Sequence, residues 1–404
     1  MFIEWLLAFA LGFVAYTYVG YPLLLALLVA ARFGEDPVAS VRVNPALGGG
    51  EVPVRGTGAW PTVTLLVAAW NEQDHVAAKV QNTRELRYPD GKLRHVWVTD
   101  GSDDDTVSML RECVGVRVFH EDRRGGKGAA LNRVLPLLDT DIVVFSDANA
   151  MYSPDAIHRL VRHFRDPRVG GVSGEKRVAR EGFVSGEGFY WTYESWLKAN
   201  ESSLHSVMGS AGEIFAIRRE LFQPVPHDAV IEDFELTMGL VARGWRNLYE
   251  PEAVAVELPC ADSAGDFERR ARITAGGCKA VLRLRMLADP STYGWVAFTF
   301  LSHRVFRWWL APAFVIAAFP LNIAVVALTG GLAWWATLLA QTLLIGLALT
   351  QHRLRRQSTW LRIPHFFYLA NASALMGIVR FLRGSQAVTW ARVPRATESN
   401  RRSL

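Results

Sequence analysis

Two long apolar runs stand on either side of a polar middle region. The first, from Trp5 to Ala31, contains no charged residue, and the second, from Trp308 to Gln351, contains none either. A helix needs about 20 apolar residues to cross a bilayer. The first run therefore predicts one membrane helix. The second is too long for one span and breaks at Gly330-Gly331, so it predicts a hairpin of two helices.

Between these runs, short apolar segments alternate with amphipathic ones. The pattern predicts strands at 62–69, 95–99, 116–119 and 142–145, and helices at 71–86, 104–112 and 127–138. Strands that alternate with helices of this length indicate an α/β fold with a mainly parallel sheet covered on both faces. Ligands of such sheets bind beyond the carboxyl ends of the strands.

These patterns divide the chain into four expected segments. Residues 1–34 hold an N-terminal membrane helix, 35–60 a linker rich in Gly and Pro, 61–289 the sheet domain, and 290–404 a C-terminal membrane region. The last segment is expected to contain an interface segment at 302–309, the hairpin at about 308–351, a further helix at about 364–382 and a basic tail. The helix at 364–382 either spans the membrane or lies in its interface.

Charge is distributed unevenly around the net value of +5. Residues 35–289 hold 31 Lys+Arg and 37 Asp+Glu, a net of −6, whereas residues 290–404 hold 12 Arg and one acid, a net of +11. Arginines beside apolar helices are typical of cytoplasmic flanks and can contact anionic membrane lipids. Basic residues interleaved with membrane spans argue against nucleic acid as a partner. We expect a multi-pass protein of the cell (inner or plasma) membrane with its sheet domain in the cytoplasm.

Polar side chains directly follow the first two expected strands. The first strand ends in Ala68-Ala69-Trp70-Asn71-Glu72, and the second in Thr99-Asp100-Gly101-Ser102-Asp103-Asp104. Carboxylates and a Gly turn at neighbouring strand ends can accept hydrogen bonds from a base and a ribose. Taken singly, each segment is equally well explained as the cap of the following helix.

The fourth expected strand is followed directly by Ser146-Asp147-Ala148-Asn149. A carboxylate at such a strand end can hold a divalent cation, Mg²⁺ or Mn²⁺, which would neutralise a diphosphate leaving group. Asp147 is the stronger candidate ligand. Asn149 offers an amide oxygen but no charge.

A Gly-rich helix start precedes this strand, at Arg124-Gly125-Gly126-Lys127-Gly128. It does not fit a P-loop, because Glu121 stands where the first Gly should be and Gly128 replaces the Ser or Thr that holds Mg²⁺. Lys127 is therefore either a cation near the bound donor or an ordinary Lys at a helix end.

Two charged clusters follow in the second half of the domain. Glu232-Asp233 begins a helical segment, where acids either favour the helix dipole or act in catalysis. Arg269, Arg270 and Arg272 stand shortly before the membrane region. They are either an interfacial basic cluster or, for Arg272, a phosphate contact made through its planar fork of donors.

Taken in order, these segments resemble glycosyltransferase family 2, a family of inverting enzymes with the GT-A fold. The arginine segment resembles a divergent Q-x-x-R-W motif, with Ile273 at the position of its Trp. The resemblance assigns the catalytic base to Asp233 and the metal to Asp147 and Asn149. It places Glu232 and Gly212 on the acceptor side. It assigns donor contacts to Ala69, Asn71, Glu72, Asp100, Ser102, Asp103, Lys127, Asp147 and Arg272.

The resemblance implies a membrane-anchored glycosyltransferase. The expected reaction moves a sugar from a nucleoside-diphosphate sugar, for which we favour a UDP-sugar, to a lipid-linked or saccharide acceptor in polysaccharide or glycolipid synthesis. Ile273 and the small number of membrane helices favour single-sugar transfer. Two alternatives stay open: a processive synthase coupled to export, and an inactive sugar-nucleotide-binding membrane protein, which Asn149 and the altered arginine motif suggest.

Overall fold

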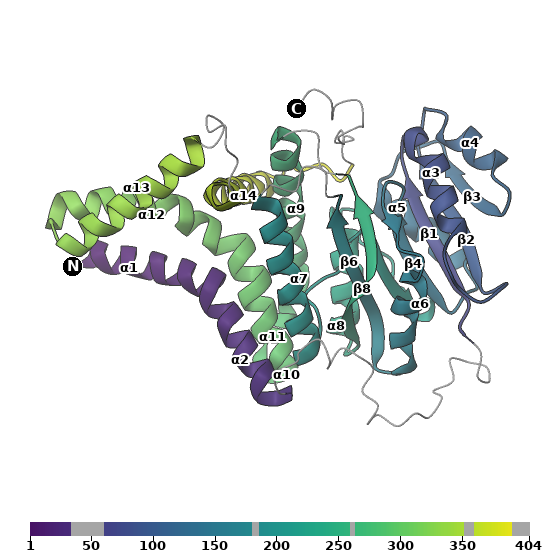
Figure 1. The fold of residues 1–404 in the computed structure, drawn as a ribbon, viewed down its shortest axis with the longest axis horizontal. Coiled ribbons are helices and arrows are strands. Elements are labelled where there is room, and N and C mark those ends of the chain that lie inside the picture. The colour runs from purple at the N-terminus through teal and green to yellow at the C-terminus, as the bar shows by residue number, and fades with distance from the viewer. Residues whose placement is uncertain (34–59, 180–185, 259–262, 351–358, 390–404) are drawn as a thin grey trace.

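The computed structural model describes residues 1–33, 60–179, 186–258, 263–350 and 359–389. The expected linker, apart from Trp60, and the basic tail beyond residue 389 lie outside the described residues. Figure 1 shows a sheet domain on one side of the molecule and a group of long helices on the other.

One mixed sheet forms the core of the sheet domain, with the strand order β3-β2-β1-β4-β7-β6-β8-β5. Strands β1, β2, β3 and β4 are parallel to one another, as predicted, and β6 is parallel to β8. Strand β7 is antiparallel to both β4 and β6, and β5 is antiparallel to β8. The strands are β1 Val63–Ala69, β2 Leu93–Asp100, β3 Val116–Glu121, β4 Ile142–Asp147, β5 Met151–Tyr152, β6 Val169–Val178, β7 Ile214–Arg218 and β8 Arg246–Glu257.

Helices cover both faces of the sheet. Because successive side chains of a strand point to opposite sides, each strand contributes to an apolar cluster on either face. In β1, Leu65 and Val67 join one apolar cluster with Trp97, and Leu66 joins another with Phe145. Helices α3, α4 and α6 contribute to the first cluster, and α5 and α8 to the second. The helices of this domain are α3 Gln73–Arg84, α4 Thr106–Glu112, α5 Lys127–Val134, α6 Ala156–Val161, α7 Gly186–Leu204, α8 Glu232–Ala242 and α9 Ser263–Arg283.

Four helical stretches in the described part of the chain are long and apolar enough to cross a membrane. They are Phe2–Arg32, Trp295–Thr329, Leu332–Thr350 and Ile363–Leu382. Gly330, with φ +65°, ends one helix and turns the chain into the next, as the predicted hairpin requires. The elements involved are α1 Phe2–Ala15, the π-helical turn Tyr16–Gly20, α2 Tyr21–Phe33, α10 Pro290–Tyr293, α11 Trp295–Thr299, the π-helical Phe300–Leu310, α12 Ala311–Thr329, α13 Leu332–Thr350 and α14 Thr359–Leu382.

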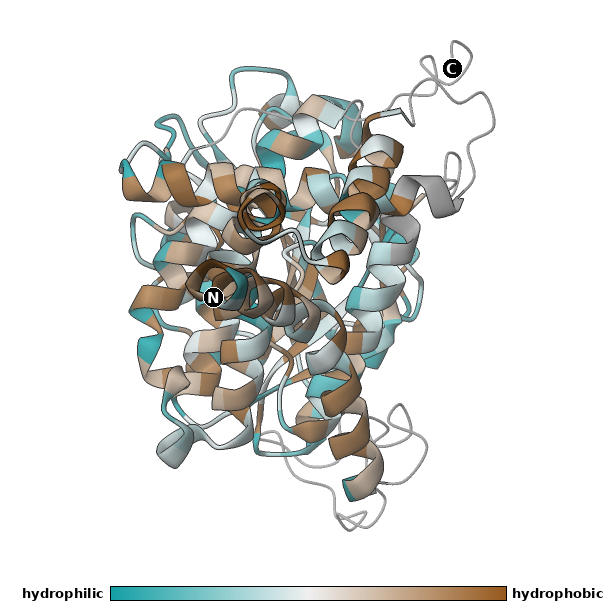
Figure 2. Cartoon of the chain, turned by 90° about the vertical axis from the view of Figure 1, so that its left-hand side faces the viewer, coloured by the Kyte–Doolittle hydropathy of each residue, from teal (hydrophilic) through white to brown (hydrophobic). Residues whose placement is uncertain are grey.

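Hydrophobic residues gather on these helices, as Figure 2 shows. Helices α1, α12 and α13 run away from the sheet domain, whereas α14 is seen almost end-on in Figure 1. Helix α14 therefore lies crosswise to the hairpin. It packs along α9, where Gly377 meets the backbone of Ala271 and Arg380 pairs with Glu268. Its length and composition suit a membrane span.

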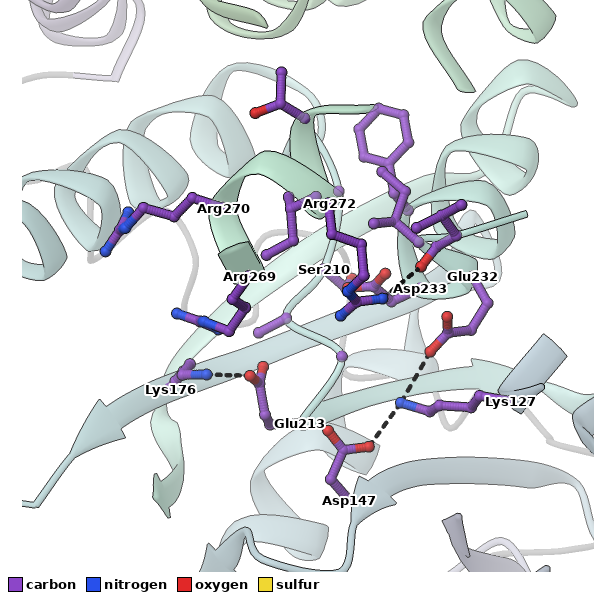
Figure 3. A pocket seen from close by; sticks show the side chains of 18 of the residues that line it. Lys127, Asp147, Lys176, Ser210, Glu213, Glu232, Asp233, Arg269, Arg270 and Arg272 are labelled. Carbon is purple, nitrogen blue, oxygen red and sulfur yellow. Dashed lines mark hydrogen bonds and ion pairs between the residues drawn. The ribbon is translucent and has the colours of Figure 1, made fainter. Parts of the chain in front are cut away.

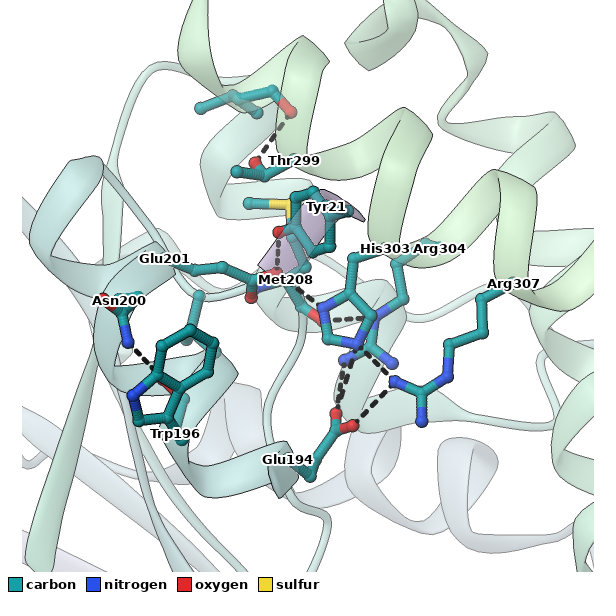
Figure 4. A network of polar contacts seen from close by, with 12 residues as sticks. Tyr21, Glu194, Trp196, Asn200, Glu201, Met208, Thr299, His303, Arg304 and Arg307 are labelled. Carbon is teal, nitrogen blue, oxygen red and sulfur yellow. Dashed lines mark hydrogen bonds and ion pairs between the residues drawn. The ribbon is translucent and has the colours of Figure 1, made fainter. Parts of the chain in front are cut away.

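The segment expected at the membrane interface is partly buried, with Ser302 and His303 buried and residues 304–309 half-buried. Phe300–Leu310, here called the junction segment, is π-helical and continues directly into α12. His303 is 1% exposed and its Nδ1 lies 2.5 Å from Glu201 Oε1. Arg307 donates to Glu194 at 3.0 Å. Helix α7 offers these two buried carboxylates, and the side chains of His303 and Arg307 turn toward them (Figure 4).

Candidate active site

A cavity of about 580 Å³ opens beyond the carboxyl ends of β1, β2 and β4 and continues between α7, α9, α14 and the junction segment. We call the part at the strand ends, around Asp147, Glu213 and Asp233, the acidic end. The part around Arg270 and Arg307 is the basic end. The acidic end collects side chains from segments far apart in the sequence (Figure 3).

Three carboxylates converge at the acidic end. Asp147 ends β4, Glu213 precedes β7, and Glu257 ends β8, and their oxygens lie within 4.8 Å of one another. Burial, together with the charges of Glu213 and Glu257, raises the pKa of Asp147 to about 6 despite the neighbouring Lys127. Burial also acts to raise the pKa of Glu213, but the adjacent Lys176 outweighs it and holds that pKa at about 2.

This carboxylate group has the chemistry of a divalent-cation site. Closely spaced oxygens with surplus negative charge are the ligands that Mg²⁺ and Mn²⁺ prefer. Burial is the main cause of the raised pKa of Asp147, and the like charges of Glu213 and Glu257 add to it, so a proton or a cation is favoured there. Asn149, the other expected ligand, also lines the cavity.

Lys127 points into the cavity from the start of α5. Its Nζ lies 2.7 Å from Asp147 Oδ1 and 2.9 Å from Glu232 Oε1. Burial acts against its charge, but these two carboxylates raise the pKa of Lys127 well above its usual value. Lys127 is therefore a fixed cation that joins the strand-end carboxylates to α8, and not a solvated Lys at a helix end.

A second lysine supports the turn that carries Asp147. Lys79 of α3 is fully buried and donates to Ser146 Oγ at 2.8 Å and to the carbonyl of Ala150. Burial lowers the pKa of Lys79 to about 7. These bonds hold both ends of the turn that carries Asp147 and Asn149.

Asp233 lies at the start of α8, on the cavity wall. Burial and the adjacent charge of Glu232 raise the pKa of Asp233 to about 7. Gly212 approaches it closely, since a Cβ at residue 212 would lie 3.2 Å from Asp233 Oδ2. Arg272 extends toward the same place and donates to the carbonyl of Val230 at 3.4 Å (Figure 3). The structure thus brings Gly212, Glu232, Asp233 and Arg272 together.

The expected donor residues divide into two groups. Ala69, Glu72 and Asp100 line the cavity. The carboxylate of Asp100 accepts from the backbone N–H groups of Gly125, at 3.0 Å, and Gly126, at 2.6 Å. Asp100 therefore fixes the loop that leads to Lys127.

Asn71, Ser102 and Asp103 form the second group, which is absent from the cavity wall among the residues that the structure describes. Asn71 donates from its backbone to Ser102 Oγ at 3.1 Å and from its side chain to Asp103 Oδ1 at 2.5 Å. The φ of +55° at Asn71 turns the backbone toward β2. These three residues tie the loops after β1 and β2 together.

Several charged residues at or beside the cavity were not selected from the sequence. Glu213 and Glu257 belong to the carboxylate group, and Lys176 pairs with both of them. Glu257 carried the same signal as Asp100 and Asp147, because it ends an apolar run of alternating Ala and Val. Glu213 follows the Gly turn that the sequence had already marked. For Lys176, the sequence offered no comparable signal.

The chain is similar in sequence to known proteins. Residues 61–276 match the family model described as "Glycosyltransferase like family 2". A poly-beta-1,6-N-acetyl-D-glucosamine synthase of Staphylococcus aureus (strain MSSA476) is 27% identical over 233 residues, which are 55% of this chain and 56% of that protein. A beta-monoglucosyldiacylglycerol synthase of Trichormus variabilis (strain ATCC 29413 / PCC 7937) is 29% identical over 201 residues, 46% of this chain and 43% of that protein. The chain spans about half the length of these curated relatives.

A solved structure resembles nearly the whole chain. The mannosyltransferase PcManGT from Pyrobaculum calidifontis, in complex with GDP-Man and Mn²⁺, superposes with a TM-score of 0.69 and 24% identity. The match covers 93% of this chain and 99% of that one. The likeness therefore extends beyond the sheet domain to the helices on both sides of it.

Proposed function

Because the chain belongs to the family 2-like glycosyltransferases and has their GT-A fold, we propose that it transfers one sugar from a nucleoside-diphosphate sugar to a membrane-proximal acceptor, with inversion. The observation that carries this proposal is the position of Asp233. Asp233 lines the same cavity as Asp147, although the two residues are 86 positions apart in the sequence. The cavity thus offers a base and a cation-binding group to one substrate.

In the proposed reaction the acceptor hydroxyl oxygen attacks the anomeric carbon of the donor sugar. The bond between that carbon and the diphosphate oxygen breaks, and its electron pair leaves with the nucleoside diphosphate. The hydroxyl proton passes to the Asp233 carboxylate. A single displacement of this kind inverts the anomeric configuration. A base pKa of about 7 suits proton transfer near neutral pH.

The leaving diphosphate needs positive charge around it. Asp147, with Glu213 and Glu257 beside it, would hold a divalent cation, Mg²⁺ or Mn²⁺, which neutralises that charge when it is bound. Lys127 and Arg272 line the same end of the cavity and present fixed cations to the phosphates. Ala69, Glu72 and Asp100 are the proposed contacts to the nucleotide. In this proposal Asn71, Ser102 and Asp103 position the donor loops.

We further propose single-sugar transfer on the cytoplasmic side of the membrane, with a UDP-sugar as donor. Ile273 lines the cavity where the family motif has a ring, which supports release after one sugar. GDP-mannose belongs among the test donors, because the structural neighbour binds it.

The test uses the purified full-length chain in an uncharged detergent, with UDP-sugars or GDP-mannose and either Mn²⁺ or Mg²⁺. We expect nucleotide release that depends on the cation, and mass spectrometry of the product should show the addition of one sugar. Asp233→Asn should lower the turnover number by about 100- to 10,000-fold, because the proton then has no acceptor. Asp139→Asn is the matched control and should keep its activity, because Asp139 precedes β4, at the end of that strand away from Asp147, and is 72% exposed. A folded Asp233→Asn protein with full activity would refute the proposed base.

A further inference from the structure

Residues 205–213 lie between α7 and β7, and we call them the cavity loop because Gly209 and Gly212 line the cavity. Gly209 has a φ of +92°, and a Cβ there would lie 2.5 Å from the Phe234 ring. A Cβ at Gly212 would lie 3.2 Å from Asp233 Oδ2. The cavity loop therefore packs directly against the start of α8, where the proposed base is.

One buried carboxylate holds the first half of the cavity loop. Glu201 of α7 and Met208 are both fully buried. The backbone N–H of Met208 donates to Glu201 Oε2 at 3.1 Å, and the Met208 carbonyl accepts from Arg304 Nε at 2.6 Å. Gly209 follows directly in the chain. Both backbone groups of Met208 are thus held just before the loop reaches Phe234.

Glu201 is held in turn by two residues of the long apolar helices. Tyr21 of α2 donates its hydroxyl to Glu201 Oε1 at 2.6 Å, and His303 Nδ1 lies 2.5 Å from the same oxygen (Figure 4). An ionised carboxylate only accepts hydrogen bonds, so Nδ1 carries the proton of the second contact. Tyr21 and His303 are each 1% exposed. Because a buried carboxylate is costly to leave unsatisfied, α2 and the junction segment both fix its position.

The second half of the cavity loop is held by the sheet. Glu213 pairs with Lys176 of β6, and the Glu213 carbonyl accepts from the Tyr152 hydroxyl at 3.1 Å. The contacts of Met208 come instead from α7 and the junction segment. Loss of these helical contacts would displace the loop beside Phe234, while the sheet still holds Glu213 in the carboxylate group.

We propose that Glu201 is a positioning residue, which fixes the cavity loop against α8 through Met208 and is itself oriented by Tyr21 and His303. The effect on the reaction rests on the proposed function, whereas the effect on the loop does not. The N-terminal membrane helix then does more than anchor the chain, because its Tyr21 supports a wall of the cavity. Glu201 is not among the described residues that line the cavity, so it acts through the loop.

Hydrogen exchange tests the hold on the loop without any substrate. The full-length chain in maltoside micelles is labelled in D₂O, and mass spectrometry measures deuterium uptake in peptides that cover 205–213. Glu201→Gln keeps the side-chain shape but turns one acceptor oxygen into a donor, so uptake in the loop should become at least about tenfold faster. Peptides from β1 should keep their wild-type uptake. Unchanged uptake in the loop, or equal acceleration in β1, would overturn the proposal.

The pH profile of nucleotide release tests the effect on the base. Release is measured without acceptor at saturating Mn²⁺, with the UDP-sugar or GDP-mannose that the wild type uses. Burial is the main cause of the raised pKa of Asp233, and its charged neighbours Glu232, Lys127 and Glu213 stay unchanged in Glu201→Gln. A displaced loop admits water beside Asp233, so this variant should lower the turnover number at least about tenfold and shift the midpoint to lower pH.

The midpoint also separates positioning from a loss of folded protein. A fraction of unfolded chain lowers the measured rate but leaves the midpoint where it was. A lower rate of Glu201→Gln with the wild-type midpoint would therefore overturn the positioning role.

A pair of tyrosine variants repeats the test without a change in charge. Tyr21→Phe removes one hydrogen bond to Glu201 and should lower the turnover number about threefold or more, with the midpoint shifted in the same direction. Tyr88→Phe is the matched control, since its hydroxyl donates to the Pro61 carbonyl at 2.7 Å outside the cavity wall. It should change the rate less than about twofold. Equal effects of the two variants would contradict the role of Tyr21.

A pair of histidine variants identifies the contact that matters. In His303→Asn the amide N–H takes the place of Nδ1 and still reaches Glu201, so most of the turnover should remain. In His303→Gln the amide takes the place of Nε2, which lies 3.4 Å from Glu194, and the turnover should fall as in Tyr21→Phe. Equal losses in both variants would show that the contact with Glu201 does not orient the loop.

The two proposals fail in different ways. No nucleotide release by the wild type would refute the proposed function, and hydrogen exchange would still confirm or overturn the hold on the loop. Wild-type release together with normal release and exchange in Glu201→Gln would leave the transferase and remove the positioning role.

Discussion

The two ends of the cavity hold opposite charges by different means. At the acidic end, Lys127 and Lys176 each bridge two carboxylates that come from the strand ends, the turn before β7 and α8. At the basic end, Arg270 and Arg307 lie against aromatic rings. A lysine ammonium is a compact point charge that fits between carboxylates, whereas a guanidinium stacks and presents a flat edge. The acidic end thus holds its carboxylates with lysines placed between them, whereas the arginines of the basic end are held by aromatic rings and by Asp266 and Glu194.

The supporting elements differ as well. At the acidic end, Asp147 ends β4 and Glu257 ends β8, so the sheet fixes both carboxylates. The basic end depends on how α14 packs on α9 and on the junction segment. We therefore expect substitutions at the acidic end to change the rate of the reaction, and substitutions at the basic end to change affinity for the acceptor.

The strongest way to test this contrast is Asp147→Asn. The change removes one negative charge from the carboxylate group while it keeps the shape of the side chain. If Asp147 binds the cation that neutralises the leaving diphosphate, its loss should cost about 3 kcal/mol of transition-state stabilisation. This is a decrease of roughly 100-fold in turnover number. Nucleotide-release assays across a range of Mn²⁺ concentrations measure both the rate and the cation requirement.

A matched variant is the control for the Asp147→Asn measurement. Asp139→Asn makes the same chemical change at an exposed site and should leave the rate and the Mn²⁺ dependence unaltered. If Asp147→Asn keeps the wild-type Mn²⁺ dependence, the carboxylate group does not hold the cation.

The acidic end also shows what the sequence can predict. Strands β1 to β4 follow one another through short helices, so each strand end could be located by its apolar run and the polar residues after it. Asp100 and Asp147 were identified in this way, and both line the cavity. Asp233 was identified by resemblance to a family motif, and it lines the same cavity.

The other half of the site depends on contacts between distant segments. Strand β7 is antiparallel to β4 and lies between β4 and β6, and nothing local in its sequence specifies those neighbours. Glu213 and Lys176 reach the cavity because of this pairing. Arg307 belongs to the segment 302–309, for which the sequence predicted a place at the membrane interface but no partner. The buried carboxylate of Glu194, on a helix that was not predicted, decides its direction.

A second prediction disturbs the basic end without touching its charges. Gly377 of α14 lies against α9, and a Cβ there would come within 2.7 Å of Thr274 Cβ and close to the Ala271 carbonyl. Backbone cannot give way cheaply, so Gly377→Ala should displace α14 and destabilise the protein by about 1–3 kcal/mol. Thermal unfolding in detergent measures the loss.

The same variant separates affinity from rate. Its KM for the acceptor should rise by more than nucleotide release without acceptor falls. The carboxylates of the acidic end lie on the sheet and α8, and of that end's residues only Arg272 is on α9 beside Gly377. Gly346→Ala, on α13 where a Cβ would meet open space, is the control. A fall in acceptor-independent release as large as the rise in KM would show that the two ends are not independent.

The third prediction concerns pH and the acidic end alone. Burial and Glu232 raise the pKa of Asp233 to about 7, so the carboxyl is mostly protonated below pH 7 and cannot take a proton from the acceptor. The turnover number at saturating Mn²⁺ should therefore rise with pH by up to about tenfold per unit below pH 7 and level off above it. Glu232→Gln removes the neighbouring charge, lowers the pKa of Asp233, and should shift the midpoint to lower pH. A substitution at the basic end, Arg270→Gln, should leave the midpoint in place. A rate that falls between pH 6 and 8 would contradict Asp233 as the base, because deprotonation creates the form that accepts the proton.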